Sequence, residues 1–260
     1  MKDVIKYLRQ SGMMPIRESK DNSILSLRKV LQISNIANLK EIIPAGAFRM
    51  ASNITVNQNV LGAWIRLCQL AGNDKTISSN FDKKYTNDLI NELKSIMCQK
   101  DAALQKDLKT VMGKYGIDFS VARNFRGAPV QGYISQKSDG IYQMVLTIRG
   151  AFADIFWFSL FHEIGHIVNG DIGKSVKFVD DGSDCDKEAA ADLFARDMLL
   201  SPESYKNFIQ KGDFTIEAIH QYAETQNVMP YIVIGRLQKE KYLDYKMHCN
   251  YKLRYKWGTR

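Results

Sequence analysis

Two histidines and a glutamate fall within five consecutive residues and could together carry out metal-dependent chemistry. His162 and His166 are four residues apart in an apolar stretch whose pattern predicts a helix. Their imidazoles then point the same way from successive turns, so both can bind one metal ion. Glu163 lies about 100° around that helix, beside the ion rather than bonded to it, which suits a general base for water. This spacing predicts a hydrolytic metal site rather than two histidines of a buried core.

A third metal ligand must come from another segment, because a catalytic zinc ion keeps three protein ligands and one open position. The extension that would add a third histidine is missing, since Asn169 and Ile172 occupy its glycine and histidine positions. A glutamate from a second helix is the other solution, and Glu188 lies in an alanine-rich stretch that predicts such a helix. Asp192, one turn further on, is predicted to accept a hydrogen bond from the outer nitrogen of a ligand histidine. Five other carboxylates in or next to the intervening loop remain competitors for the third position: Asp171, Asp180, Asp181, Asp184 and Asp186.

The two segments together resemble the ImmA/IrrE family of metallopeptidases. That family pairs H-E-x-G-H on one helix with E-x-x-A-x-x-F-A on the next. Residues 146–149, 156–158 and 200–202 are also similar to the family, within a resemblance that covers about residues 131–237. It is weaker at 47–49 and 64–66. The motif positions that match are His162, Glu163, Gly165 and His166, then Glu188, Ala191, Phe194 and Ala195.

This resemblance implies a zincin-like metallo-endopeptidase that holds Zn²⁺, with Mn²⁺ or another divalent ion left open. It implies a protein substrate, such as a phage-type repressor or an antitoxin. The helix-turn-helix that often precedes this domain in the family is not evident here. Residues 27–37 could be forced into that shape but have no clear partner helix, so we expect no sequence-specific DNA binding by this chain. The alternative is a regulator that retains the metal site and works without cleavage, or in association with DNA.

Four residues beyond the second motif are candidates for stabilising the oxyanion of the transition state. They share a polar group that can donate a hydrogen bond, and a purely structural role is the alternative for each. These candidates are His220, Tyr222, Tyr231 and Arg236.

The elements that must position these residues follow from the hydrophobic periodicity. Apolar residues three and four apart predict helices around 61–68, 89–97 and 104–115, the second capped by Thr86 and the third ended by Gly116. Alternation at 117–121, 131–135 and 142–148 predicts a small sheet of about three strands, and the helical period then returns until about residue 245. We therefore expect a mainly helical α+β fold. It divides into a helical N-terminal region (1–100), a peptidase domain (101–237) and a basic aromatic tail (238–260).

Composition and charge place the chain in a reducing compartment and away from membranes. The four cysteines form no C-x-x-C pair, and the first ten residues are too charged for a signal peptide, so we expect a cytoplasmic protein. The most apolar stretch, 155–168, is too short to cross a bilayer. Residues 236–260 hold eight basic and two acidic residues, which is +6 of the chain's net charge of +8. Five aromatic residues interleave with these charges, and we expect a docked C-terminal helix, with nucleic-acid stacking as the alternative: Tyr242, Tyr245, Tyr251, Tyr255 and Trp257.

Overall fold

The fold is mainly helical with one small sheet, as the periodicity predicts. In the computed structural model of the 260-residue chain, the described residues are 1–43, 56–71, 77, 79–99, 103–128, 130, 132–137, 140–148, 152–173 and 185–255. They form helices α1 to α10 and a three-stranded sheet, which makes the class α+β. The weak family match at 47–49 and the loop carboxylates at 180, 181 and 184 lie outside these residues.

The sheet consists of the three strands that alternation predicts. They are β1 (Ile117–Ala122), β2 (Gly132–Gln136) and β3 (Tyr142–Thr147), in the order β1-β3-β2. The central strand β3 runs parallel to β1 and antiparallel to β2, so β2 is an edge strand. Successive side chains point to opposite faces. Met144 and Leu146 therefore enter one hydrophobic cluster while Val145 enters another.

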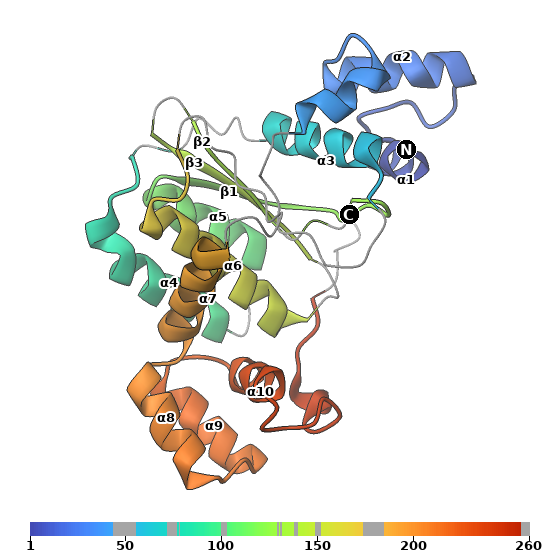
Figure 1. The fold of residues 1–260 in the computed structure, drawn as a ribbon. Helices are drawn as coiled ribbons and strands as arrows, with labels where there is room; N and C mark the ends of the chain where they lie inside the picture. Colours follow the sequence, from blue (N-terminus) through green and yellow to red (C-terminus); the bar gives the residue numbers. More distant parts are fainter. Residues whose placement is uncertain are drawn as a thin grey trace.

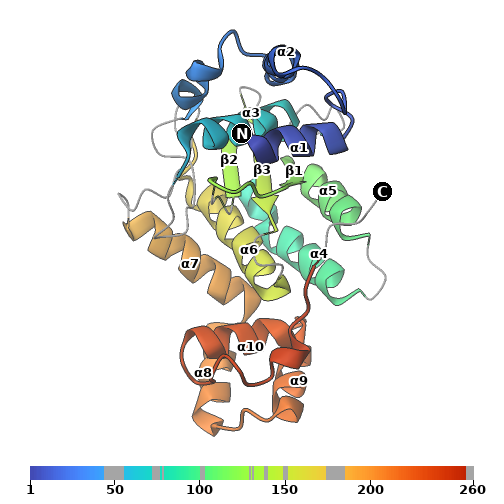
Figure 2. The same ribbon diagram turned by 90° about the vertical axis from the view of Figure 1, so that its right-hand side faces the viewer.

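The N-terminal helices cover one face of this sheet (Figures 1 and 2). They are α1 (Lys2–Gln10), α2 (Lys20–Leu31) and α3 (Gln58–Ala71), with a 3-10 helix at Ile36–Ile42. Trp64 of α3 is buried against Tyr133 of β2, and Gln143 of β3 donates to the carbonyl of Cys68 at 2.6 Å. Residues 27–37 are the end of α2 and the start of the 3-10 helix, so this segment does not form a helix-turn-helix.

The opposite face of the sheet packs on α4 (Thr86–Cys98), α5 (Leu104–Lys114) and α6 (Ala153–Asn169) (Figure 2). Helix α7 (Cys185–Leu199) lies along α6. Thr86 is the first residue of α4 rather than its cap, because the chain enters through a 3-10 turn at Lys83–Tyr85. Leu93 of α4 and Leu108 of α5 share one hydrophobic cluster with α6.

Three further helices form the end of the molecule opposite α1–α3: α8 (Pro202–Lys211), α9 (Ile216–Thr225) and α10 (Pro230–Lys239) (Figure 1). Beyond α10 the prediction of a docked C-terminal helix is wrong. The described chain up to Tyr255 forms turns and one 3-10 turn at Cys249–Tyr251. None of the described helices has both the length and the apolar character needed to span a bilayer.

The tail docks on the beginning of α6 through charges, backbone and one aromatic ring. Leu253 accepts the backbone N–H of Ala153 at 3.0 Å, and Lys252 forms a nearly buried ion pair with Asp154 at 2.7 Å. The hydroxyl of Tyr255 accepts the indole N–H of Trp157 at 2.8 Å. The tail therefore anchors the first turn of the helix that carries the H-E-x-x-H motif.

Candidate metal centre

Most residues of helix α6 are buried, and the helix packs closely against α7. A glycine and an alanine meet at this contact. A Cβ at Gly165 would lie 3.2 Å from the Cα of Ala191 and 3.1 Å from the ring of Phe194. The two helices approach closely because Gly165 has no side chain and Ala191 is small and buried. This contact brings the predicted ligands of α6 and α7 to one place.

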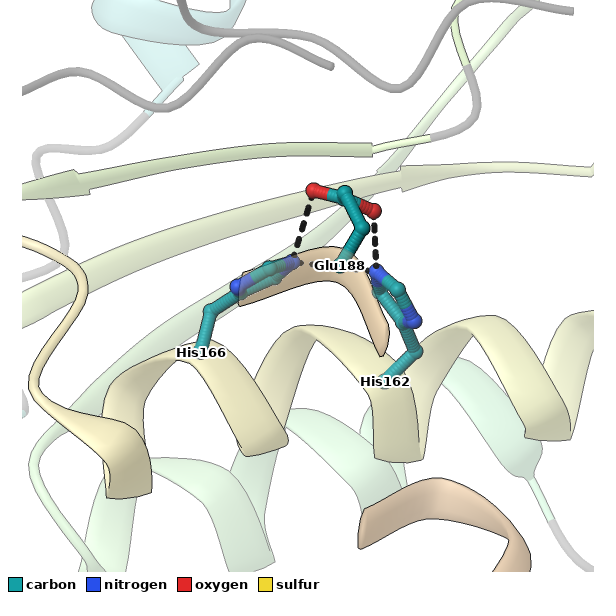
Figure 3. A group of neighbouring side chains, drawn as sticks. All are labelled: His162, His166 and Glu188. Atoms are coloured by element: carbon teal, nitrogen blue, oxygen red, sulfur yellow. Dashed lines mark hydrogen bonds and ion pairs between the residues drawn. The ribbon is translucent and has the colours of Figure 1, made fainter. Parts of the chain in front are cut away.

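His162, His166 and Glu188 lie together with their donor atoms converging (Figure 3). The Nε2 atoms of His162 and His166 are 3.0 Å apart, and the two carboxylate oxygens of Glu188 lie 3.2 and 3.3 Å from them. Bonds of ~2.1 Å to a tetrahedral zinc ion would place neighbouring ligand atoms about 3.4 Å apart. The two imidazoles and the carboxylate therefore fit a zinc ion, both in donor type and in spacing.

Each histidine is oriented by a carboxylate on its outer nitrogen. Asp192 accepts a hydrogen bond from Nδ1 of His162 at 2.7 Å, and Asp171 accepts one from Nδ1 of His166 at 2.9 Å. In the neutral tautomer that donates from Nδ1, each Nε2 carries a lone pair and no proton. Both lone pairs then face the space shared with Glu188. This is the usual outer support of metal-ligating histidines.

Asp171 orients His166, whereas the sequence predicted it only as a competing metal ligand. Gly170 ends α6 in the left-handed region at φ 79°, and the N–H of Asp171 then donates to the carbonyl of His166 at 3.0 Å. This turn folds the Asp171 side chain back onto the imidazole. Gly170, directly after the helix, is the signal in the sequence from which this turn could have been predicted. Asp186, another competitor, is exposed in the first turn of α7.

The surroundings of the two imidazoles are strongly acidic and favour a cation. In the chain without metal, where Nε2 can carry the proton instead, burial opposes ionisation of the Glu188 carboxyl, but hydrogen bonds from His162 and His166 outweigh it and hold the pKa of Glu188 well below its ordinary value. Burial likewise lowers the pKa of His166, yet Glu188, Glu163 and Asp171 raise it overall. In the chain without metal the cluster thus attracts positive charge, which a divalent ion can supply.

Glu163 is buried beside the cluster, with only 6% of its surface exposed, and packs against the sheet. Its carboxylate rests on Gly132 of β2. A Cβ at Gly132 would collide with Oε1 of Glu163 and lie 2.9 Å from its Cδ. Gly132 carries no signal of this contact in the sequence, because only the packing of β2 on α6 makes the two residues neighbours.

The four candidates for transition-state stabilisation are engaged in the packing of α8–α10 and the tail. His220 is exposed and packs edge-on against Tyr251, Tyr222 stacks on Phe208 at 4.2 Å, and Tyr231 is buried in the core. Arg236 stacks on Tyr205 and donates to Glu240 and to the carbonyl of Arg196. The contacts described for these four residues do not include His162, His166 or Glu188, and their role stays a prediction.

A scan against models of protein families found no match to this chain. A search of curated proteins found no related sequence either.

Proposed function

We propose that this protein is a zinc-dependent endopeptidase with a zincin-like catalytic domain. The observation that carries the proposal is the meeting of His162, His166 and Glu188 at ligand spacing, with Glu163 buried beside them. Two imidazoles and one carboxylate are the ligand set of several zinc hydrolases, and three protein ligands leave a position open for the reaction.

Each residue has a separate part in this chemistry. His162, His166 and Glu188 would hold the ion, while Asp192 and Asp171 fix the two rings. A zinc ion held there would supply a Lewis acid that acidifies water and polarises the scissile carbonyl. The carboxylate of Glu163 accepts the proton of the attacking water and returns it to the leaving amine.

The edge of the sheet supports a peptide as the substrate. Among the described residues β2 pairs only with β3, and Gly132 on this edge strand contacts Glu163. An extended peptide that added to the free edge of β2 would run beside the catalytic carboxylate. The similarity to ImmA/IrrE peptidases favours a regulatory protein, such as a repressor or an antitoxin, as that substrate, and a cytoplasmic site of action.

Removal and return of zinc tests the proposal. The purified chain, stripped with a chelator and reloaded with zinc, is incubated with a proteome-derived peptide library, and mass spectrometry records new cleavage products. We expect about one zinc ion per chain and cleavage only after reloading. Glu188→Ala should lose both, and the control Asp186→Ala, exposed in the same helix turn, should keep both. Equal cleavage with and without zinc would contradict the proposal.

A further inference from the structure

A cavity of about 560 Å³ lies next to the metal centre, between α6, α7, α10 and the tail. Its volume is in the range of ligand-binding sites. Asp192 belongs to both places, since its Oδ1 orients His162 while its side chain, 41% exposed, lines the cavity. Ala189, the neighbour of Glu188, lines it too. The cavity therefore begins directly behind the ligands of the proposed ion.

One wall of the cavity is apolar. Ile155 and Phe158 of α6 and Ile232 of α10 contribute to it. Ile155 is 42% exposed although it belongs to the most buried helix of the fold. The ring of Phe158 lies 6.2 Å from that of His162, measured between centroids, and connects this wall to the metal centre. Such a wall accommodates a bulky apolar side chain.

The charged lining residues, with Asp192 counted among them, leave a net charge of +1. Asp154 is neutralised by Lys252 at 2.7 Å, and Glu240 by Arg236 at 3.0 Å. Two more cations, Arg196 and Lys239, line the cavity and are exposed. Neither forms an ion pair with a residue in the described part of the chain. An anionic group that entered here would meet these two cations, while the third carboxylate of the lining, Asp192, is engaged with His162.

We propose that this cavity is a specificity site that binds a bulky apolar side chain next to a carboxylate side chain of the peptide substrate. The inference rests on the proposed peptidase function and adds to it the substrate class. The apolar side chain lies against Ile155 and Phe158, and the neighbouring carboxylate lies between Arg196 and Lys239. The substrate is then a segment in which an aromatic or large aliphatic residue adjoins Asp or Glu.

Binding of small capped dipeptides tests the site without any cleavage. The probes are N-acetyl-Phe-Glu-amide, N-acetyl-Phe-Lys-amide and N-acetyl-Ala-Glu-amide, titrated into the zinc-loaded full-length Glu163→Gln variant and followed by NMR. We expect the Phe-Glu probe to bind about tenfold more tightly than either of the others, because each of them lacks one of the two interactions. Equal binding of all three probes would overturn the proposal.

Charge reversal locates the binding and excludes a contribution from the metal. Arg196→Glu, combined with Glu163→Gln, should lower the affinity for the Phe-Glu probe about tenfold and raise the affinity for the Phe-Lys probe. The matched control, Arg17→Glu, makes the same charge change at an exposed position of the segment between α1 and α2 and should change neither. If Arg196→Glu and Arg17→Glu bind the Phe-Glu probe alike, the carboxylate is held elsewhere, for example at zinc, and the assignment is wrong. Ile155→Ala should lower the affinity for both Phe-containing probes and leave the affinity for the Ala-Glu probe unchanged. If Ile155→Ala leaves the affinity for the Phe probes unchanged, the assignment of the apolar wall is wrong.

Failure of the two proposals can be told apart. If the wild-type chain cleaves no peptide but the dipeptides bind as expected, the peptidase function is wrong and the cavity remains a binding site. If cleavage occurs and its products show no preference for an apolar residue beside Asp or Glu, the cavity does not select the substrate.

Discussion

Gly132 of the edge strand β2 and Glu163 of α6 are in direct contact, and the contact exists only because position 132 has no side chain. The carboxylate of Glu163 occupies the space that a Cβ at Gly132 would need. The strand therefore fixes where the proposed general base can lie, although it contributes no functional group of its own.

Substitution of this glycine should separate metal binding from catalysis. Gly132→Ala pushes the Glu163 carboxylate away from its position but touches none of the three ligands. We expect zinc affinity within about threefold of wild type and cleavage reduced at least ~100-fold, because small misplacements of catalytic groups are costly. The measurements are a zinc titration and the peptide-library assay.

Gly113→Ala is the matched control, since among the described residues a Cβ there would come within 4 Å of Ile77 alone, at 3.9 Å. It introduces the same methyl group within α5 and should leave both measurements unchanged. If Gly132→Ala cleaves as well as Gly113→Ala, the position of Glu163 is not critical and its assignment as the base is in doubt.

The two outer carboxylates should contribute to zinc affinity in the same way. Asp171→Asn and Asp192→Asn each replace a charged acceptor of a histidine Nδ1–H with a neutral amide. We expect each to lower zinc affinity about 10- to 100-fold, as the loss of outer support usually does. Isothermal titration with zinc measures this, and Asp197→Asn, in the last turn of α7, is the control. Wild-type affinity in Asp171→Asn would show that the turn at Gly170 does not support the metal site.

The ion pair between the tail and α6 should stabilise the whole fold. Lys252→Met keeps most of the apolar stem but leaves the nearly buried Asp154 without its counter-charge. The free energy of unfolding should fall by about 3 kcal/mol, since an unpaired buried charge is expensive. Urea denaturation measures the change. Lys246→Met, at an exposed tail position, should change stability by less than ~0.5 kcal/mol; equal stability of the two variants would mean that the tail does not anchor α6.

The local parts of this structure were predictable from the sequence. Helical periodicity placed His162 and His166 on one face, and the same periodicity placed Glu188 one turn before Asp192. Alternation of apolar residues gave the three strands. These features depend on repeats of two or 3.6 residues, which the order of residues along the chain records directly.

The remaining features depend on contacts between distant segments. The pairing of Asp171 with His166 requires the left-handed turn at Gly170, and the contact of Gly132 with Glu163 requires a particular packing of β2 on α6. Neither the turn nor this packing can be predicted from hydrophobic periodicity. The tail was expected to be a docked helix because its aromatic residues interleave with basic ones. It is instead held in turns by Lys252, Leu253 and Tyr255, which bond to residues about 100 positions earlier.

The central claim is that Glu163 acts as the base of a metal-dependent peptidase, and Glu163→Gln tests it most directly. This variant keeps all three ligands and nearly the same volume but cannot accept a proton. Zinc-loaded wild type and variant are incubated with the same peptide library, and the zinc content and the rate of appearance of new peptide N-termini are measured for both. We predict one zinc ion per chain in each protein and a rate at least ~1,000-fold lower in the variant. Cleavage by Glu163→Gln at the wild-type rate, with zinc bound, would contradict the account.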